Sequence, residues 1–373
     1  MIKIMDTSMY KHSKFMVIGV IYFVLSTVVL FTCLGASAVA KDTDNPPTGA
    51  ANIHSLSSGV ARLVPDNLFA VDFVSDQVGW VAGYYGTLLH TDNGGQTWTH
   101  HALPVNDLIR RIDFLDEQTG WAVSSRGRIL KTQDGGASWR VMHEEPGIYL
   151  RDVHFVSKQE GWVIGHEATI LHTVNGGQLW TKQTLSNFTG RDLPRLNGIA
   201  SSSAGHLYVV GEFGVIAETV NGGDQWTILS PGQLNVTFVD VTVAQGVGWA
   251  VGLGGNVVRI SPPVDPVADG AVNREQAAPA RISLLPSVIS AHLFTVNSDA
   301  KGAVVAAGQG VLYKIDPQGD MSLMSLPEST PDYIWYGGAV ARPSSDEWVI
   351  VGANGSVVGL NVTSGTSNSL VRW

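Results

Sequence analysis

A repeat of about 41 residues constrains the fold of this 373-residue chain more than any other feature. Tryptophan recurs at two points of each repeat. The first series, with a spacing of 41 residues, is Trp80, Trp121 and Trp162. The second series, with spacings of 41, 41 and 46 residues, is Trp98, Trp139, Trp180 and Trp226. A period of this length is typical of an array of similar supersecondary units, each of which buries its apolar face against the next.

Each repeat contains four short segments with the character of β-strands. In the first repeat these are Leu68–Val74, Trp80–Gly83, Thr87–Thr91 and Thr97–His101. The sequence DNGG between the last two supplies the positive φ angles that a tight hairpin needs. Because no run of ten or more residues in these repeats has a helical period, a unit of about 40 residues with four strands is predicted to be one β-propeller blade.

The sequence therefore predicts an all-β fold, a seven-bladed β-propeller of four-stranded blades. Two weaker repeats, Ile289–Leu326 and Tyr333–Trp373, bring the count to seven, and six or eight blades is the alternative. Residues 261–280 are rich in Pro and Ala and are expected to be a mobile insert. Ile53–Val64 is expected to add an outer strand to the last blade, so that the ring closes without a free edge. The first five blades are expected at 66–104, 107–144, 148–185, 192–230 and from Val236 onwards.

Residues 1–40 have the pattern of an export signal. Lysines precede an apolar run at residues 15–34, and Ala38-Val39-Ala40 then offers a small-residue cleavage site. The apolar run is longer than is usual for a cleaved signal, so the segment is expected to be a signal peptide or a signal anchor in the membrane. Residues 41–52 are expected to be a linker and 53–373 the propeller. Such a protein would work in a periplasm or a lumen.

Composition excludes several classes of function. The single cysteine, Cys33, lies in the export segment, which leaves no disulfide, thiol catalysis or cysteine-ligated metal for the propeller. A formal net charge of −9 disfavours binding to bulk nucleic acid or to an anionic membrane surface. His100 and His101 are adjacent in a strand and face opposite sides, so they cannot ligate one ion together. No metal site and no cofactor are predicted.

Four of the repeats contain an Asp-box turn, with the pattern S/T-x-D-x-G-x-S/T-W. The match is complete at Thr132–Trp139, whereas the other three copies have Asn at the acidic position. The acid or amide is expected to cap the turn by accepting backbone N–H groups, and the tryptophan to pack beneath it. Because a turn that is repeated on every blade faces outwards, these residues are predicted to be structural and not catalytic. They are Asn93, Asp134, Asn175, Asn221, Trp98, Trp139, Trp180 and Trp226.

With these turns and their flanking sequence, the chain resembles the photosystem II stability/assembly factor family. The shared pattern is F-x-x-x-x-x-G-W-x-x-G-x-x-G-x-I/L-x-x-T-x-N/D-G-G-x-x-W, and it is good over about 66–260 and faint over 261–373. The resemblance implies an exported, non-enzymatic seven-bladed propeller that holds a membrane-protein complex or its assembly intermediate. It also implies an arginine-rich patch, and Arg110 and Arg151 lie at equivalent places in neighbouring blades. The factor is expected to be a monomer.

Propeller geometry predicts where a partner would bind. The start of each inner strand and the loop between the second and third strands emerge on the same face. Arginine and aromatic side chains there have the composition of an interface hot spot, although each one alone could equally be an ordinary exposed loop residue. The predicted partner-binding residues are Arg110, Arg111, Arg151, Arg195, Tyr84, Tyr85, Arg126 and Phe213.

Two alternatives remain open on the sequence. A sialidase-like glycosidase also carries Asp boxes, and it would need an arginine cluster, a nucleophilic Tyr with a Glu, and an acidic Asp. Tyr149 and Glu144 are available, but no FRIP-like arginine motif precedes the first repeat. A periplasmic accessory protein of a transporter is the other alternative. A shared repeat indicates a fold and not a site, so the chain is expected not to be an enzyme, and no catalytic residue is assigned.

Overall fold

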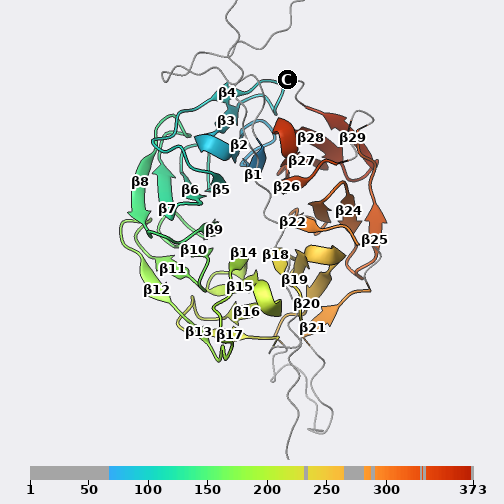
Figure 1. Ribbon diagram of the computed structural model, residues 1–373. Coiled ribbons are helices and arrows are strands. Elements are labelled where there is room, and N and C mark those ends of the chain that lie inside the picture. The colour runs from blue at the N-terminus through green and yellow to red at the C-terminus, as the bar shows by residue number, and fades with distance from the viewer. Residues whose placement is uncertain are drawn as a thin grey trace, which may run out of the picture. The chain divides into compact units, whose positions relative to one another are not determined.

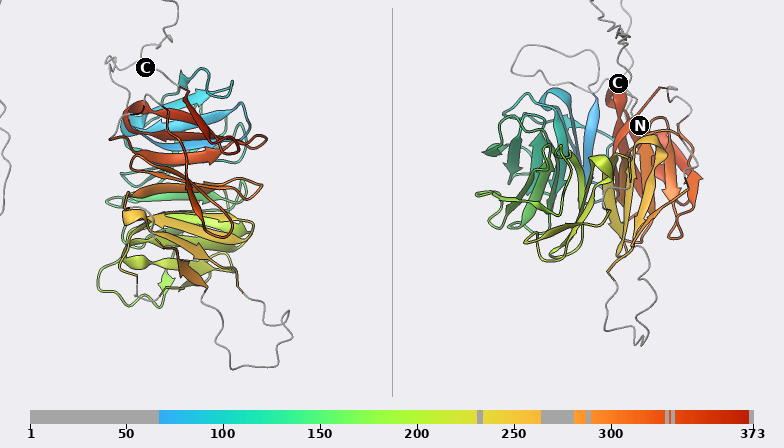
Figure 2. Two further views of the ribbon diagram at one scale, coloured as in Figure 1. Left: turned by 90° about the vertical axis from the view of Figure 1, so that its right-hand side faces the viewer. Right: turned by 60° about the horizontal axis from the view of Figure 1, so that its bottom comes forward.

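The computed structural model describes residues 67–230, 234–263, 281–286, 290–327, 330 and 333–370, all of them within one compact unit. These residues form seven sheets in a ring, antiparallel except for one short parallel pair in the fourth, which confirms the seven-bladed β-propeller predicted from the repeats (Figure 1). Figure 2 shows the ring from the side, as a disc whose two faces carry the loops. The export segment, the linker, the strand expected at Ile53–Val64 and residues 264–280 of the insert lie outside the described residues.

The strands follow one another from the hub to the rim in each blade. Blade one contains β1 (Leu68–Phe73), β2 (Gly79–Gly83), β3 (Leu88–Thr91) and β4 (Thr99–His100). Blade two contains β5 (Ile109–Phe114), β6 (Gly120–Ser124), β7 (Arg128–Thr132) and β8 (Arg140–Glu144). Blade three contains β9 (Leu150–Phe155), β10 (Gly161–Gly165), β11 (Ile170–Thr173) and β12 (Thr181–Gln183). Blade four contains β14 (Leu196–Ser203), β15 (His206–Gly211), β16 (Ile216–Thr219) and β17 (Trp226–Ile228), with β13 (Leu185–Ser186) added at its edge.

The last three blades have the same plan. Blade five contains β18 (Phe238–Ala244), β19 (Val247–Gly252), β20 (Val257–Ile260) and β21 (Ile282–Leu284). Blade six contains β22 (Leu293–Ser298), β23 (Val304–Gly308), β24 (Leu312–Ile315) and β25 (Met321–Leu323). Blade seven contains β26 (Tyr336–Ala341), β27 (Glu347–Gly352), β28 (Val357–Asn361) and β29 (Thr366–Ser369). Four short 3₁₀ turns join second to third strands: η1 (Tyr84–Gly86), η2 (Glu212–Gly214), η3 (Leu253–Gly255) and η4 (Ala353–Gly355).

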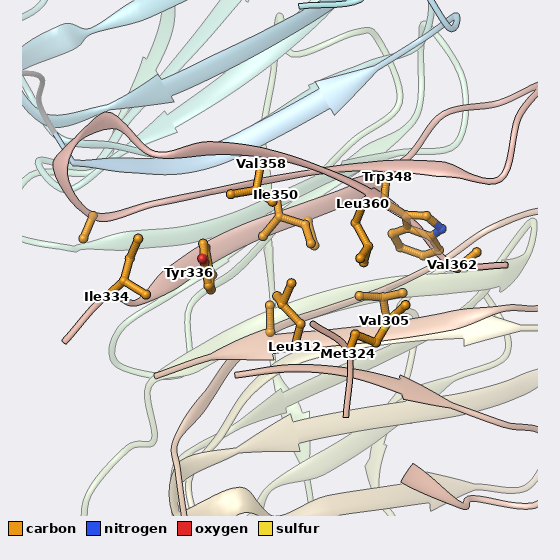
Figure 3. Packing of buried hydrophobic residues seen from close by; sticks show 13 residues of the cluster. Val305, Leu312, Met324, Ile334, Tyr336, Trp348, Ile350, Val358, Leu360 and Val362 are labelled. Carbon is orange, nitrogen blue, oxygen red and sulfur yellow. The ribbon is translucent and has the colours of Figure 1, made fainter. Parts of the chain in front are cut away.

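The hydrophobic core lies between neighbouring blades. Its seven clusters of buried side chains each combine two adjacent blades, including blade seven with blade one. In the cluster between blades six and seven, Trp348 and Ile350 lie opposite Val305 and Leu312 (Figure 3). A blade alone would expose these side chains to water, so each blade depends on its neighbours for stability.

The first tryptophan series is buried in these interfaces. The Trp80 indole stacks on Phe114 of the next blade with ring centroids 3.6 Å apart, and Trp121 stacks on Phe155 at the same distance. Trp348, on β27, holds the equivalent place in blade seven and is fully buried. The tryptophan period therefore marks the positions where one blade packs on the next.

The Asp-box turns are held together by their own side chains. In blade two, the Thr132 hydroxyl donates to Asp134 and accepts the N–H of Gly136, while Asp134 Oδ1 accepts the N–H of Ser138 at 2.8 Å. The other three boxes form the same bonds through an Asn side-chain oxygen. A single side-chain oxygen caps the turn, so Asn and Asp serve equally well. Both glycines have positive φ in every box, for example 70° and 87° at Gly135 and Gly136.

Each Asp-box turn is also fastened to the preceding blade. The carbonyl oxygen of its first glycine accepts a hydrogen bond from a different side chain in each case. The four donor–acceptor pairs are Trp80 to Gly135 (2.9 Å), Lys131 to Gly176 (2.9 Å), Gln183 to Gly222 (3.1 Å) and Arg342 to Gly94 (2.6 Å). The contact is the same around the ring although its donor varies.

The segment between blades three and four adds a short strand. β13 pairs in parallel with β17 at the outer edge of blade four, with Leu185 opposite Trp226. This segment lies within the longer 46-residue spacing from Trp180 to Trp226. A strand that follows blade three therefore covers the edge of blade four, where backbone groups would otherwise be unpaired.

Packing and side-chain hydrogen bonds close the described ring. The outermost strand of blade seven is β29, which follows β28 in the chain, and β26 lies beside β1 (Figure 1). Arg342 is 7% exposed and donates to the backbone oxygens of Asp76 and Gly94 in blade one. Asn354 N–H donates to Asn67 Oδ1 at 2.8 Å across the same junction. Among the described residues, no helix has the length and apolar character needed to cross a membrane.

Hub aspartates link successive inner strands. Asp72 Oδ2 accepts the N–H of Phe114 in the next blade at 2.7 Å, and Asp113 Oδ2 accepts the N–H of Phe155 at 2.5 Å. Burial raises the pKa of Asp72 to about 6, against the lowering effect of its backbone hydrogen bonds, and burial together with Asp72 raises the pKa of Asp113. The hub thus favours protonated aspartates more than the unfolded chain does.

Replacement of Arg342 tests the closure of the ring. Arg342→Met leaves two backbone oxygens, one buried and one partly buried, without their charged donor, so we expect the free energy of unfolding to fall by roughly 1.5–3 kcal/mol. Urea unfolding of the purified protein measures this loss. Lys131→Met is the control, because Lys131 makes the equivalent hydrogen bond between blades two and three at a more exposed site. This variant should lose less stability. Equal losses would show that the first and last blades do not depend on Arg342 in particular.

Asp72 gives a prediction about pH. A carboxyl whose pKa is raised in the folded state favours folding at low pH, and this contribution is lost as the pH rises from about 4 to about 6. Asp72→Asn keeps an oxygen acceptor without the buried charge. Asn297 occupies the equivalent position of β22, where its amide nitrogen donates to the Ala339 carbonyl oxygen of the next blade. We expect the free energy of unfolding of Asp72→Asn to exceed that of wild type by roughly 1–3 kcal/mol at pH 8. At pH 4 the two values should differ little.

Thermal unfolding at both pH values measures the effect of Asp72→Asn. Asp134→Asn is the control, because hydrogen bonds from Ser138 lower the pKa of this exposed carboxyl. It should show no stabilisation that grows with pH. A gap between wild type and Asp72→Asn that is the same at pH 4 and pH 8 would rule out the buried charge as the cause.

Candidate partner-binding site

One residue of every inner strand is displaced from the strand ladder by a β-bulge. In β5, Ile109 pairs with Ser124 and Arg111 pairs with Val123, so Arg110 has no opposite residue on β6. The same shift occurs in the inner strands of all seven blades. A bulge bends the strand and changes the direction of a side chain. The bulged residues are Phe69, Arg110, Arg151, Asn197, Val239, Phe294 and Gly337.

The seven bulged residues all line one depression of about 630 Å³ at the hub. The 3₁₀ turns between second and third strands add Tyr84, Glu212 and Leu253 to its wall. The segments that lead into the inner strands add further residues: Leu108, Tyr149, Arg195, Thr237, His292, Tyr333 and Trp335. A hollow of this size is typical of a ligand-binding site.

Arg110 and Arg151 lie in this depression and form no ion pair with an acidic residue in the part of the chain that the structure describes. Arg110 is 5% exposed, and its Nη1 has no hydrogen-bond acceptor among the described residues. Burial, followed by the charges of Arg151 and Arg111, lowers the pKa of Arg110 to about 9. Burial also lowers the pKa of Arg151. Two guanidinium groups, one buried and one partly buried, face this hollow without a paired carboxylate among the described residues, and together they provide a site for an anion.

Aromatic rings surround the two guanidinium groups. The Arg110 guanidinium lies 5.7 Å from the centroid of the Phe69 ring, and the Arg151 guanidinium lies 5.2 Å from that of Tyr149. Arg195, also in the depression, is more exposed and pairs with Glu212 at 3.4 Å. Arg110 and Arg151 are therefore the cations that remain available to a ligand.

Arg111 departs from the predicted set because the bulge gives it the opposite direction from Arg110. It lies deeper in the hub, in a separate cavity of about 230 Å³, and pairs with Asp152 at 3.2 Å and Asp240 at 3.0 Å. Burial alone would lower the pKa of Arg111, but Asp240 and Asp152 raise it above its usual value. Arg111 thereby joins blades two, three and five, and it is a structural cation.

The remaining predicted residues are distributed differently. Tyr84 lines the depression, whereas Tyr85, Phe213 and Arg126 are not part of its lining. Tyr85 and Phe213 occupy equivalent positions of η1 and η2 with positive φ, and are 56% and 51% exposed. The Arg126 side chain is 73% exposed and lies 3.6 Å from Asp107. The structure thus brings together Arg110, Arg151, Arg195 and Tyr84 out of the eight residues.

Sequence reasoning missed the aromatic part of the depression. Phe69 and Phe294 occupy the same bulge position as Arg110, so counting along the repeat would have found them. Trp335 and Tyr333 precede β26 in the degenerate seventh repeat, and no spacing in the sequence marks them.

The two neighbouring arginines should respond oppositely to the same substitution. Arg110→Met removes an unpaired buried charge and keeps a similar shape, so we expect the free energy of unfolding to rise by roughly 1–3 kcal/mol. Arg111→Met leaves two buried carboxylates without their cation, and should lower it by roughly 3–5 kcal/mol. Chemical denaturation of both variants measures the difference. A loss of stability in Arg110→Met would contradict the inference that Arg110 is an unpaired charge.

Comparison with known proteins points to one family. The family model of the photosynthesis system II assembly factor YCF48 matches residues 96–194. Curated protein sequences give no match. The solved structure of YCF48 bound to D1 peptide has a TM-score of 0.60 and 17% identity, covering 80% of this chain and 93% of that chain. YCF48 from Cyanidioschyzon merolae has a TM-score of 0.62 and 20% identity, with coverages of 80% and 96%.

The fold is also shared with enzymes. A streptogramin B lyase has a TM-score of 0.65 and 12% identity, covering 83% of this chain and 95% of that chain. At such identities the structural likeness shows the fold alone, whereas the match over 96–194 lies in the Asp-box repeats themselves. The resemblance found in the repeats is thereby confirmed: residues 96–194 match the YCF48 family model, and the described ring shares the β-propeller fold of YCF48.

Proposed function

We propose that this propeller is a non-enzymatic scaffold that holds an anionic segment of a membrane-protein partner in the depression at the hub. The observation that carries the proposal is the pair Arg110 and Arg151. Arg110 is buried and Arg151 partly buried, and neither forms an ion pair with any residue that the structure describes. A buried charge without a partner destabilises a protein, so its presence in a hollow indicates a ligand that supplies the missing anion.

The charge of the whole chain makes this site distinctive. The formal net charge is −9, yet the depression collects Arg110, Arg151 and Arg195 around a mostly apolar wall. The long-range field therefore repels anionic polymers, while the local site attracts one anionic group at short range. This combination suits a partner that contributes a single short segment.

Similarity to YCF48 supports the class of partner. YCF48 has been solved bound to D1 peptide, and that protein shares the present fold. By extension, we propose a membrane-protein complex or its assembly intermediate as the partner of this chain. The pattern of residues 1–40 supports work in a periplasm or lumen, with residues 15–34 as a cleaved signal or as an anchor.

The glycosidase alternative finds little support in the geometry. Tyr149 lines the depression, but Glu144 lies on β8, the outermost strand of blade two, and pairs with Arg128 at 2.9 Å. Tyr149 and Glu144, the pair that the sequence offered for a sialidase-like site, are thus not placed together. Glu212 does line the depression with Tyr149, but it pairs with Arg195 at 3.4 Å. An accessory role beside a transporter would use the same depression, and identifying the captured partner distinguishes it from an assembly role.

Charge reversal in the depression tests the proposed function. Arg110→Glu with Arg151→Glu should reduce co-purification of membrane partners by at least about tenfold, because two cations that attract the anionic segment are replaced by anions that repel it. The melting temperature should not fall enough to explain the loss, since neither arginine has an ion partner to lose. Partner capture from solubilised membranes, quantified by mass spectrometry, measures the effect.

The control carries the same change of charge in the same two blades. Arg140→Glu with Lys182→Glu alters residues on the outer strands β8 and β12 and should leave capture intact. Capture that survives Arg110→Glu with Arg151→Glu would refute the depression as the binding site. Turnover of a fluorogenic sialoside that Arg151→Ala abolishes would instead support the glycosidase alternative.

A further inference from the structure

The depression has two chemically different halves. Blades two to four contribute Arg110, Arg151 and Arg195. Blades six, seven and one contribute aromatic side chains in their place: Phe294, Tyr333, Trp335, Phe69 and Tyr84. A ligand that fills the hollow therefore meets cations on one side and apolar rings on the other.

Trp335 fills a place that a bulged side chain occupies in six of the blades. The bulged residue of blade seven is Gly337, and a Cβ atom there would lie 2.9 Å from a ring carbon of Trp335. The indole thus extends over the hub because Gly337 leaves room for it. The Trp335 backbone is held by a bridge to Gln309 and by a hydrogen bond from Ala353 N–H at 2.9 Å, so the ring has a fixed base.

Phe69 joins the two halves. Its ring centroid lies 4.9 Å from that of Trp335 and 5.1 Å from that of Tyr84, and Arg110 lies over the same ring. The cation and the indole are therefore neighbours of one aromatic ring. In an extended peptide, side chains at positions i and i+2 point the same way and are roughly 7 Å apart, which allows one to reach the arginines and the other the rings.

We propose that the depression selects an extended protein segment in which an acidic side chain stands two residues from an aromatic side chain. Arg110 and Arg151 bind the carboxylate, and Trp335 with Phe69 packs against the ring of the ligand. Charge complementarity fixes the anionic position, and stacking on a rigid aromatic surface fixes the apolar one. This inference rests on the proposed function and adds Trp335 and Phe69 as the residues that determine specificity.

Labelled peptides test the selectivity directly. The full chain is titrated against fluorescein-labelled Gly-Ser-Asp-Ser-Phe-Ser-Gly, and against versions in which Phe is replaced by Ser or Asp by Asn, with fluorescence anisotropy as the readout. Wild type should bind the Asp/Phe peptide about tenfold more tightly than the Asp/Ser peptide. Trp335→Ala should abolish this preference while keeping the weaker affinity for Asp/Ser.

Two further variants separate packing from folding. Trp335→Phe keeps an aromatic ring and should retain most of the preference for the Phe-containing peptide. Phe213→Ala removes an exposed ring outside the depression and should bind as wild type does. Gly337→Ala should weaken selectivity in the same direction as Trp335→Ala, because its methyl group displaces the indole.

The outcomes distinguish this inference from the proposed function. Peptides that bind through Arg110 and Arg151 but with equal affinity for Phe and Ser would overturn the inference and leave the scaffold proposal standing. A preference for Phe that survives Trp335→Ala would also overturn it. If no acidic peptide binds and charge reversal at the arginines leaves partner capture unchanged, the proposed function fails as well.

Discussion

Apolar packing between neighbouring blades is the interaction on which the rest of this structure depends. The seven clusters of buried side chains each belong to two blades, so no blade has a core of its own. The polar contacts follow the same route from blade to blade. Aspartates at the hub accept N–H groups of the next inner strand, and side chains further out in each blade donate to the Asp-box turn of the next blade. The first and last described blades must therefore pack on each other, and Arg342 of blade seven donates a hydrogen bond to blade one. The described sheet of blade seven contains only strands from its own repeat.

The same ring supplies the geometry of the site. Seven inner strands meet at the hub. A bulge near the start of each strand directs one side-chain position toward the same hollow. The bulge also explains why consecutive arginines have opposite roles. Arg110 faces the hollow and forms no ion pair with the described residues, whereas Arg111 lines the separate inner cavity and pairs with both Asp152 and Asp240. Arg111 thus stabilises the protein through its ion pairs, whereas Arg110 and Arg151 remain able to bind an anion.

Likeness of fold does not decide function here, because propellers of similar shape include both assembly factors and a lyase. The argument for a scaffold comes from the content of the depression. Arg110 and Arg151 have no paired carboxylate among the described residues, and Trp335 and Phe69 form an apolar surface beside Arg110. These are the features of a surface that recognises a short segment of another protein.

The sequence by itself determined the architecture, because that information is local and repeated. The tryptophan period and the glycine turns predicted the blades, and the start of each inner strand predicted where Arg110 and Arg151 would lie. The tertiary structure alone decided what those arginines contact. The carboxylates that pair with Arg111 lie on strands about 40 and 130 residues further along the chain. Trp335 lies at the hub although its repeat has almost none of the residues that define the other repeats. A single-residue bulge changes which side of a strand a side chain faces, and this shift depends on pairing with the neighbouring strand, which the sequence does not mark.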